Sequence, residues 1–241
     1  KLNKQVLNSI MTKWLASVQS LDEAQALSSC LPDILDLKNP SSGALGALPL
    51  STVATVVDWL DGRCLSSATV GDLPMQAETI SAAVRAMTET GVDYVKVGLF
   101  ADFRLKDCLI NLGPLLAGMK TPVIAVLFAD EEVDLDLLPL IQQAGFSGVM
   151  VDTAIKNGQG LLSHWSQDRL SDFISRARQL KLLCGLAGSL RIEDIDKLEP
   201  LGADYLGFRS ALCDQQQRTR GLLVSQARSV QQRLQQFGLA C

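Results

Sequence analysis

Three lysines stand beside carboxylates at the ends of apolar segments, which is an arrangement suited to imine chemistry. Lys38 follows Asp36 by two residues, Lys96 lies inside an apolar run, and Asp152 precedes Lys156 by four. A deprotonated amine attacks a carbonyl carbon to form an imine, which makes the neighbouring carbon acidic. The group therefore predicts aldol-type joining and dehydration of a small carbonyl compound, with the aspartates as acids, bases or orienting partners.

Lys96 is the most informative of these residues. If its neighbours Val95 and Val97 point outward from a strand, Lys96 points inward, because successive side chains alternate. Lysine is rarely buried without a partner, and burial favours its uncharged, nucleophilic form. The alternative interpretation is that Lys96 is a purely structural partner of Asp36 or Asp152.

Residues suited to binding phosphate follow other apolar segments. Small and cationic residues at such positions can hold an anion through backbone N–H groups and charge. The candidates are Asn39, Gly188, Ser189, Arg209 and Ser210.

Eight short β-rich runs must position these residues. They are Trp14–Gln19, Asp33–Leu37, Cys64–Val70, Tyr94–Phe100, Pro122–Phe128, Gly148–Asp152, Leu182–Leu186 and Tyr205–Phe208. Their nearly continuous apolar character is typical of parallel strands buried on both faces. Segments with helical spacing separate them, for example Ala77–Thr90, Leu170–Leu180 and Ile192–Leu198. The alternation predicts an α/β protein with a single (β/α)₈ TIM barrel, and an open doubly wound sheet is the alternative.

The whole chain, residues 1–241, is expected to form one barrel domain, with residues 1–11 as a peripheral extension and Gln226–Gln236 in a closing helix. Gly91 and Gly202 precede two of the runs and are expected to end helices in the left-handed conformation. The active site of such a barrel lies at the carboxyl ends of its strands, and phosphate often binds after strands seven and eight.

Composition narrows the class of partner. The formal net charge is −4 and no basic run is present, which argues against nucleic acid. No apolar run is long enough to span a membrane. The six cysteines include no CxxC pair and there is one histidine, His164, so neither a metal nor an organic cofactor is expected. We expect a cytoplasmic homo-oligomer with reduced thiols that binds a small anionic substrate.

Six segments, in order along the chain, carry a family resemblance. They are Asp36–Pro40, Ser67–Pro74, Asp93–Leu99, Asp152–Gly158, Leu186–Ser189 and Gly207–Cys213. Together they resemble the (5-formylfuran-3-yl)methyl phosphate synthases, also called 4-(hydroxymethyl)-2-furancarboxaldehyde-phosphate synthases, and the similarity extends over residues 12 to 225.

The resemblance implies a lyase that condenses two glyceraldehyde 3-phosphate molecules with loss of water and one phosphate. The furan aldehyde phosphate that results would serve the biosynthesis of methanofuran- and methylofuran-type cofactors. By the same resemblance Lys38 forms the imine, Lys96 and Lys156 assist proton transfer and substrate binding, and Asp36 and Asp152 are acidic active-site residues.

One segment departs from the family pattern. After Cys213, family members carry a glycine-rich stretch before an arginine, whereas this chain has Asp214-Gln215-Gln216-Gln217-Arg218. The change predicts a weaker phosphate cradle near the last strand. Two alternatives to furan synthesis stay open: another lysine-dependent aldolase of triose phosphates, and a non-catalytic relative.

Overall fold

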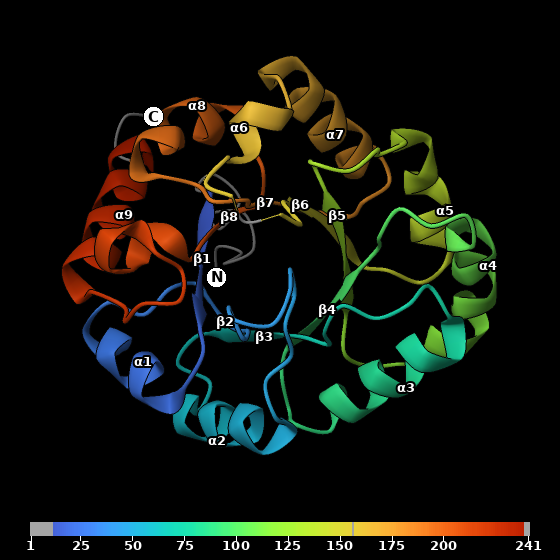
Figure 1. Ribbon diagram of the computed structural model, residues 1–241, viewed down its shortest axis with the longest axis horizontal. Helices are drawn as coiled ribbons and strands as arrows, with labels where there is room; N and C mark the ends of the chain where they lie inside the picture. The colour runs from blue at the N-terminus through green and yellow to red at the C-terminus, as the bar shows by residue number, and fades with distance from the viewer. Residues whose placement is uncertain (1–11, 156, 239–241) are drawn as a thin grey trace, which may run out of the picture.

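Eight parallel strands pair in chain order and close into a barrel in the computed structural model, which describes residues 12–155 and 157–238 (Figure 1). The strands are β1 (Lys13–Val18), β2 (Ile34–Leu37), β3 (Leu65–Thr69), β4 (Tyr94–Gly98), β5 (Val123–Phe128), β6 (Gly148–Asp152), β7 (Leu183–Leu186) and β8 (Tyr205–Phe208). Pairing of Ala16 with Phe208 joins the first strand to the last. The predicted barrel is confirmed and the open sheet is excluded.

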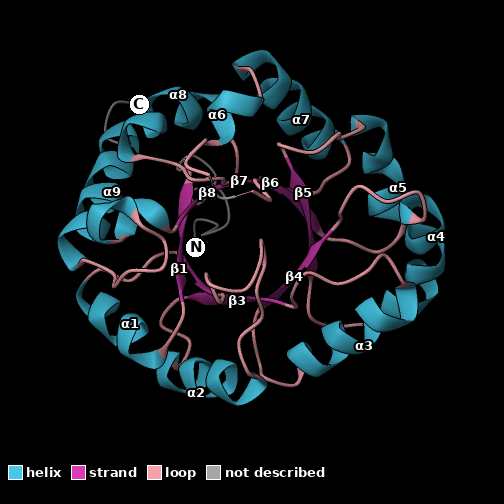
Figure 2. Cartoon of the chain, in the orientation of Figure 1, coloured by secondary structure: helices cyan, strands magenta, loops and turns pink. Residues whose placement is uncertain are grey.

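Helices surround the strands on the outside (Figure 2). They are α1 (Leu21–Ala26), α2 (Leu50–Leu60), α3 (Ala77–Thr88), α4 (Leu105–Leu116), α5 (Leu138–Gln143), α6 (Leu161–His164), α7 (Gln167–Gln179), α8 (Ile195–Leu198) and α9 (Val224–Gly238). Gly91 and Gly202 have φ values of 83° and 74°, which confirms the left-handed turns expected before β4 and β8. None of the described helices is long and apolar enough to cross a membrane.

Local boundaries differ from the sequence expectations by small amounts. The helix expected over Ile192–Leu198 consists of a 3₁₀ turn, Ile192–Asp194, followed by the short α8. The run Cys64–Val70 forms a strand only over its central five residues, β3. Residues 1–11 and Lys156 lie outside the described residues.

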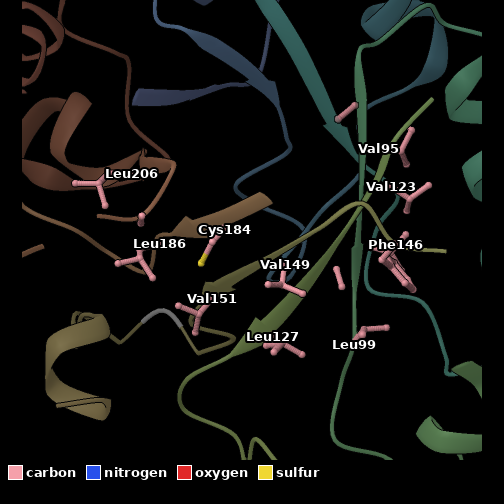
Figure 3. Close-up of a cluster of buried hydrophobic side chains, with 14 of the residues drawn as sticks. Val95, Leu99, Val123, Leu127, Phe146, Val149, Val151, Cys184, Leu186 and Leu206 are labelled. Carbon is pink, nitrogen blue, oxygen red and sulfur yellow. The ribbon is translucent and has the colours of Figure 1, made fainter. Parts of the chain in front are cut away.

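An outer hydrophobic core lies between the barrel and its helices. Val95 and Val97 of β4 belong to it, together with helix residues such as Val84 and Leu109. Figure 3 shows Val95 beside Val123 and other outward-facing strand residues of this layer. Because both neighbours of Lys96 point outward, Lys96 points into the barrel, as predicted.

An inner core fills the barrel below the site. Leu15, Ile124, Met150 and Tyr205 are buried there, from strands on opposite sides of the ring. The Tyr205 ring lies over Gly185 of the neighbouring β7, where an added Cβ would meet the ring's Cζ at 2.2 Å. Glycine at this position therefore makes room for the tyrosine that closes the floor of the barrel.

Gly185→Ala is expected to lower the free energy of unfolding by about 1–3 kcal/mol, because overpacking displaces buried side chains. Urea titration followed by circular dichroism measures the change. Gly221→Ala is the matched control, since a Cβ there would meet nothing within 4 Å. Equal stability of the two variants would contradict the packing role given to Gly185.

Candidate active site

A pocket of about 440 Å³ opens at the carboxyl ends of the strands. Its polar lining consists of Ser17, Lys38, Lys96, Asp152, Gly188, Ser189, Arg209, Ser210 and Arg218. Seven of the ten predicted site residues are in this set. Asp36 lies beneath it against Lys96, Asn39 follows Lys38 in the chain but does not line the pocket, and Lys156 is outside the described residues.

Lys96 and Asp36 form a buried ion pair at the bottom of this pocket. Lys96 Nζ lies 2.6 Å from Asp36 Oδ1, and the two side chains are 3% and 0% exposed. Asp36 also accepts hydrogen bonds from Ser17 Oγ at 2.8 Å and Ser67 Oγ at 2.7 Å. The carboxylate therefore has three donors from three strands. Neither serine was identified from the sequence, since only the strand register brings both to Asp36.

Burial and charge act on this pair in opposite directions. Burial lowers the pKa of Lys96, and the attraction of Asp36 offsets part of that shift. Burial alone would raise the pKa of Asp36, but the positive charges of Lys96 and Lys38 and the hydrogen bonds hold it below its ordinary value. Burial thus makes the Lys96 amine easier to deprotonate, while its ion pair with Asp36 favours the charged form of both groups.

The lowered pKa of Asp36 predicts a pH dependence of stability. The unfolded state binds more protons than the folded state below the ordinary value of 3.8. The stability that this carboxylate contributes is therefore complete above that pH and is lost as pH falls through the lower folded pKa. We expect the wild type to lose more of its free energy of unfolding below pH 3.8 than the double variant Lys96→Met/Asp36→Asn, which lacks this carboxylate. Urea titrations at neutral and acidic pH measure both losses, and equal losses would contradict the assignment.

Lys38 and Asp152 form a second, looser pair nearer the opening. Lys38 Nζ lies 3.4 Å from Asp152 Oδ2, with side-chain exposures of 8% and 7%. Asp152 Oδ1 accepts the Thr153 N–H at 2.7 Å. Although Asp36 and Lys38 share a face of one strand, each makes its ion pair with a residue of another strand, β4 or β6.

Two carboxylates that were not identified from the sequence hold the neighbouring loops. Asp72 accepts both N–H groups of residues 44–45, in the loop after Lys38, at 2.7 Å. Asp130 accepts those of residues 154–155, after β6, at 2.7 and 2.6 Å. Each aspartate follows a strand within a few residues, which is the sequence signal that could have identified them.

Arg209, expected to bind phosphate, has its guanidinium fully occupied. Glu23 accepts from Nη1 at 2.5 Å and from Nη2 at 3.1 Å. Backbone carbonyls of Ser17, Arg218 and Arg220 accept the remaining N–H groups. An arginine has five N–H donors, so none remains for a ligand in this conformation. The position at the pocket is as expected, whereas the role as a phosphate ligand stays a prediction.

The other expected phosphate ligands differ in their availability. Asn39 Oδ1 accepts the Ser41 N–H at 3.0 Å and shapes its own loop. Gly188 has a φ of 109° and brings the backbone close to Thr153, where a Cβ would lie 3.1 Å from the methyl group. Ser189 and Ser210 are half-buried, and their hydroxyls have no hydrogen-bond partner in the described part of the chain. These two hydroxyls are therefore available to a ligand.

Arg218, which was not predicted as a site residue, lies in the segment that departs from the family pattern. Its half-buried guanidinium donates to the Pro40 carbonyl and, at 2.8 Å, to the Gly43 carbonyl. Gln215 and Gln216 have φ values of 50° and 56°, in the left-handed region that favours glycine. The glutamines thus adopt a backbone conformation that glycine would adopt without strain, and Arg218 still reaches the pocket.

Cys184 and Cys213 give no sign of a reactive thiolate. Cys184 is buried in β7, and burial raises the pKa of its thiol. Burial likewise raises the pKa of Cys213, to about 11, and its Sγ donates to the Arg209 carbonyl at 3.2 Å. Protonated thiols are poor nucleophiles. Within the described ranges, no group of three or more His, Cys, Asp or Glu residues is placed to hold a metal ion.

Solved structures with low sequence identity share the fold. Phosphoribosyl anthranilate isomerase from Thermus thermophilus superposes with a TM-score of 0.65 at 12% identity, covering 92% of this chain and 98% of its own. At this identity the likeness shows the barrel architecture and nothing about the reaction.

Sequence relatives show the family. A family model described as 4-HFC-P synthase matches residues 14–231. A Methylorubrum extorquens protein, provisionally assigned as (5-formylfuran-3-yl)methyl phosphate synthase, is 39% identical over 228 residues, covering 92% of both chains. The (5-formylfuran-3-yl)methyl phosphate synthase of Methanococcus maripaludis is 33% identical over 217 residues, covering 86% of this chain and 92% of its own. The chain therefore belongs to the 4-HFC-P synthase family of enzymes.

Proposed function

We propose that this enzyme condenses two glyceraldehyde 3-phosphate molecules into (5-formylfuran-3-yl)methyl phosphate through an imine on a lysine. The overall balance releases one phosphate and two water molecules. The observation that carries the proposal is the pair of buried lysine–aspartate contacts around one pocket, Lys38–Asp152 and Lys96–Asp36, in a chain of this family.

Lys38 is the residue to which we assign the imine. Its side chain is more exposed than that of Lys96, 8% against 3%, and its ion pair is longer, 3.4 Å against 2.6 Å. A longer, single contact is easier to break when a carbonyl carbon approaches. Imine formation joins Nζ to the carbonyl carbon and releases the carbonyl oxygen as water.

Asp152 and Lys96 are assigned to proton transfer around that imine. Asp152 lies within reach of the Lys38 nitrogen and can accept and return protons there. Lys96 lines the same pocket, and burial lowers the pKa of its amine, so it gives up a proton more readily than an exposed lysine would. Asp36 orients Lys96 through the short contact beneath the pocket. The family resemblance is the basis for assigning Lys156 a role in substrate binding and proton transfer.

Incubation with glyceraldehyde 3-phosphate alone tests this function. We expect an ultraviolet-absorbing furan aldehyde phosphate, identified by its mass, together with one inorganic phosphate for each product molecule. A sugar phosphate formed without loss of phosphate would indicate a different lysine-dependent aldolase. No consumption of the substrate would favour a non-catalytic relative.

A further inference from the structure

A second, outer cavity of about 1240 Å³ opens beside the inner pocket. Ser189, Ser210 and Arg218 line both cavities, so the two are adjacent and share a wall. The outer cavity is formed by the loops that follow β2, β6, β7 and β8.

The charged groups of the outer cavity are all positive in the described part of the chain. Arg191 and Arg218 line it, and no described lining residue is an aspartate or glutamate. Arg191 has an exposed side chain without a hydrogen-bond or ion-pair partner among the described residues. The Asp194 carboxylate lies outside this lining and accepts the backbone N–H of Arg191 at 2.8 Å. A concave surface whose described lining contains two guanidinium groups and no carboxylate favours an anionic ligand.

Hydrogen bonds fix the Arg218 guanidinium, and some of its N–H donors remain unused within the described part of the chain. Its Nε and Nη2 atoms donate to the backbone carbonyls of Pro40 and Gly43. No hydrogen bond within the described ranges uses Nη1, which carries two N–H groups. Fixing part of a guanidinium on neutral carbonyls leaves its positive charge uncompensated by any ion pair, which suits it to a phosphate.

The proposed reaction needs such a second site. Each triose phosphate carries a phosphate monoester with a charge of about −1.5 to −2 at neutral pH, so two phosphates in one small pocket would repel each other. Arg209 cannot serve the second one in this conformation, because all of its N–H groups have acceptors. Separate cations at a distance from the first phosphate are therefore required.

We propose that the outer cavity binds the phosphate group of the second triose phosphate, through Arg191 and Arg218. The aldehyde end of that molecule then extends past Ser189 and Ser210 toward the imine on Lys38. The inference rests on the proposed function and adds to it the location of the second substrate molecule.

Arg191→Ala tests the proposal, because the exposed Arg191 side chain makes no hydrogen bond or ion pair with another described residue, so the fold should persist without it. A charge-assisted hydrogen bond contributes about 1.5–3 kcal/mol, so we expect kcat/KM for furan formation to fall about 10- to 100-fold, mainly through KM. Borohydride trapping of the first molecule on Lys38 should be unchanged. Arg191→Lys should recover part of the loss. Arg85→Ala, which removes an exposed guanidinium of α3 and its 3.1 Å hydrogen bond to the Leu115 carbonyl, is the control for loss of a cation away from the site.

Three outcomes would overturn the proposal. One is a KM for Arg191→Ala equal to that of the wild type. Another is a loss of borohydride trapping on Lys38 in Arg191→Ala as large as the loss of kcat/KM. That result would mean that Arg191 binds the first substrate molecule. A third is a rise in KM for Arg85→Ala as large as that for Arg191→Ala. Absence of furan product from the wild type would instead contradict the proposed function, so the two failures are distinguishable.

Discussion

Replacement of Lys38 by alanine is expected to lower turnover by at least about 10³-fold, because the amine that forms the covalent intermediate is lost. The side chain is 8% exposed and, among the described residues, its one ion pair is the 3.4 Å contact with Asp152, so the barrel itself should persist. Furan formation from glyceraldehyde 3-phosphate measures turnover, and circular dichroism verifies the fold.

Lys38→Arg separates covalent chemistry from charge. Arginine keeps a positive group beside Asp152, but a guanidinium does not form an imine under these conditions. We expect this variant to be as inactive as Lys38→Ala. Lys106→Ala, at an exposed position of α4, should retain wild-type turnover. Substantial activity in Lys38→Arg would mean that Lys38 acts only through its charge.

Lys96→Met is expected to lower turnover by about 10²- to 10⁴-fold, the range typical of a lost acid–base group. The same change leaves Asp36 buried without its cation, and removing one partner of a buried pair costs about 3–5 kcal/mol. Hydrogen bonds from Ser17 and Ser67 remain, so the fold should survive this loss. Turnover and urea titration are measured on the same preparation.

The double variant Lys96→Met/Asp36→Asn distinguishes catalysis from structure. Neutralising Asp36 removes the unpaired buried charge, so the double variant should be more stable than Lys96→Met alone. If Lys96 takes part in the chemistry, turnover stays low despite the recovered stability. Recovery of wild-type turnover would show that Lys96 is a purely structural partner of Asp36.

The fold was predictable because it depends on patterns that are local in the sequence. Strands buried on both faces read as continuous apolar runs, and glycines such as Gly91 ended the helices between them as expected. Alternation along β4 was sufficient to direct Lys96 inward. Collecting the strand ends of a barrel at one rim then brings Lys38, Lys96 and Asp152 into one pocket.

The partners of those residues were not predictable, because they depend on contacts between distant segments. Glu23 in α1 occupies the guanidinium of Arg209, 186 residues later in the chain. Arg218 reaches the pocket because Gln215 and Gln216 adopt left-handed backbone conformations, which their residue types do not suggest. The choice of Asp152 rather than Asp36 as the partner of Lys38 likewise depends on the positions of several strands at once.

Borohydride reduction in the presence of glyceraldehyde 3-phosphate, followed by peptide mass spectrometry, tests the central claim most directly. Hydride reduces an imine to a stable secondary amine and so marks the lysine that formed it. We expect one adduct, of the mass of a reduced triose phosphate, on the peptide containing Lys38, and none in Lys38→Arg. An adduct on Lys96 or Lys156 instead, or no adduct during active furan synthesis, would contradict it.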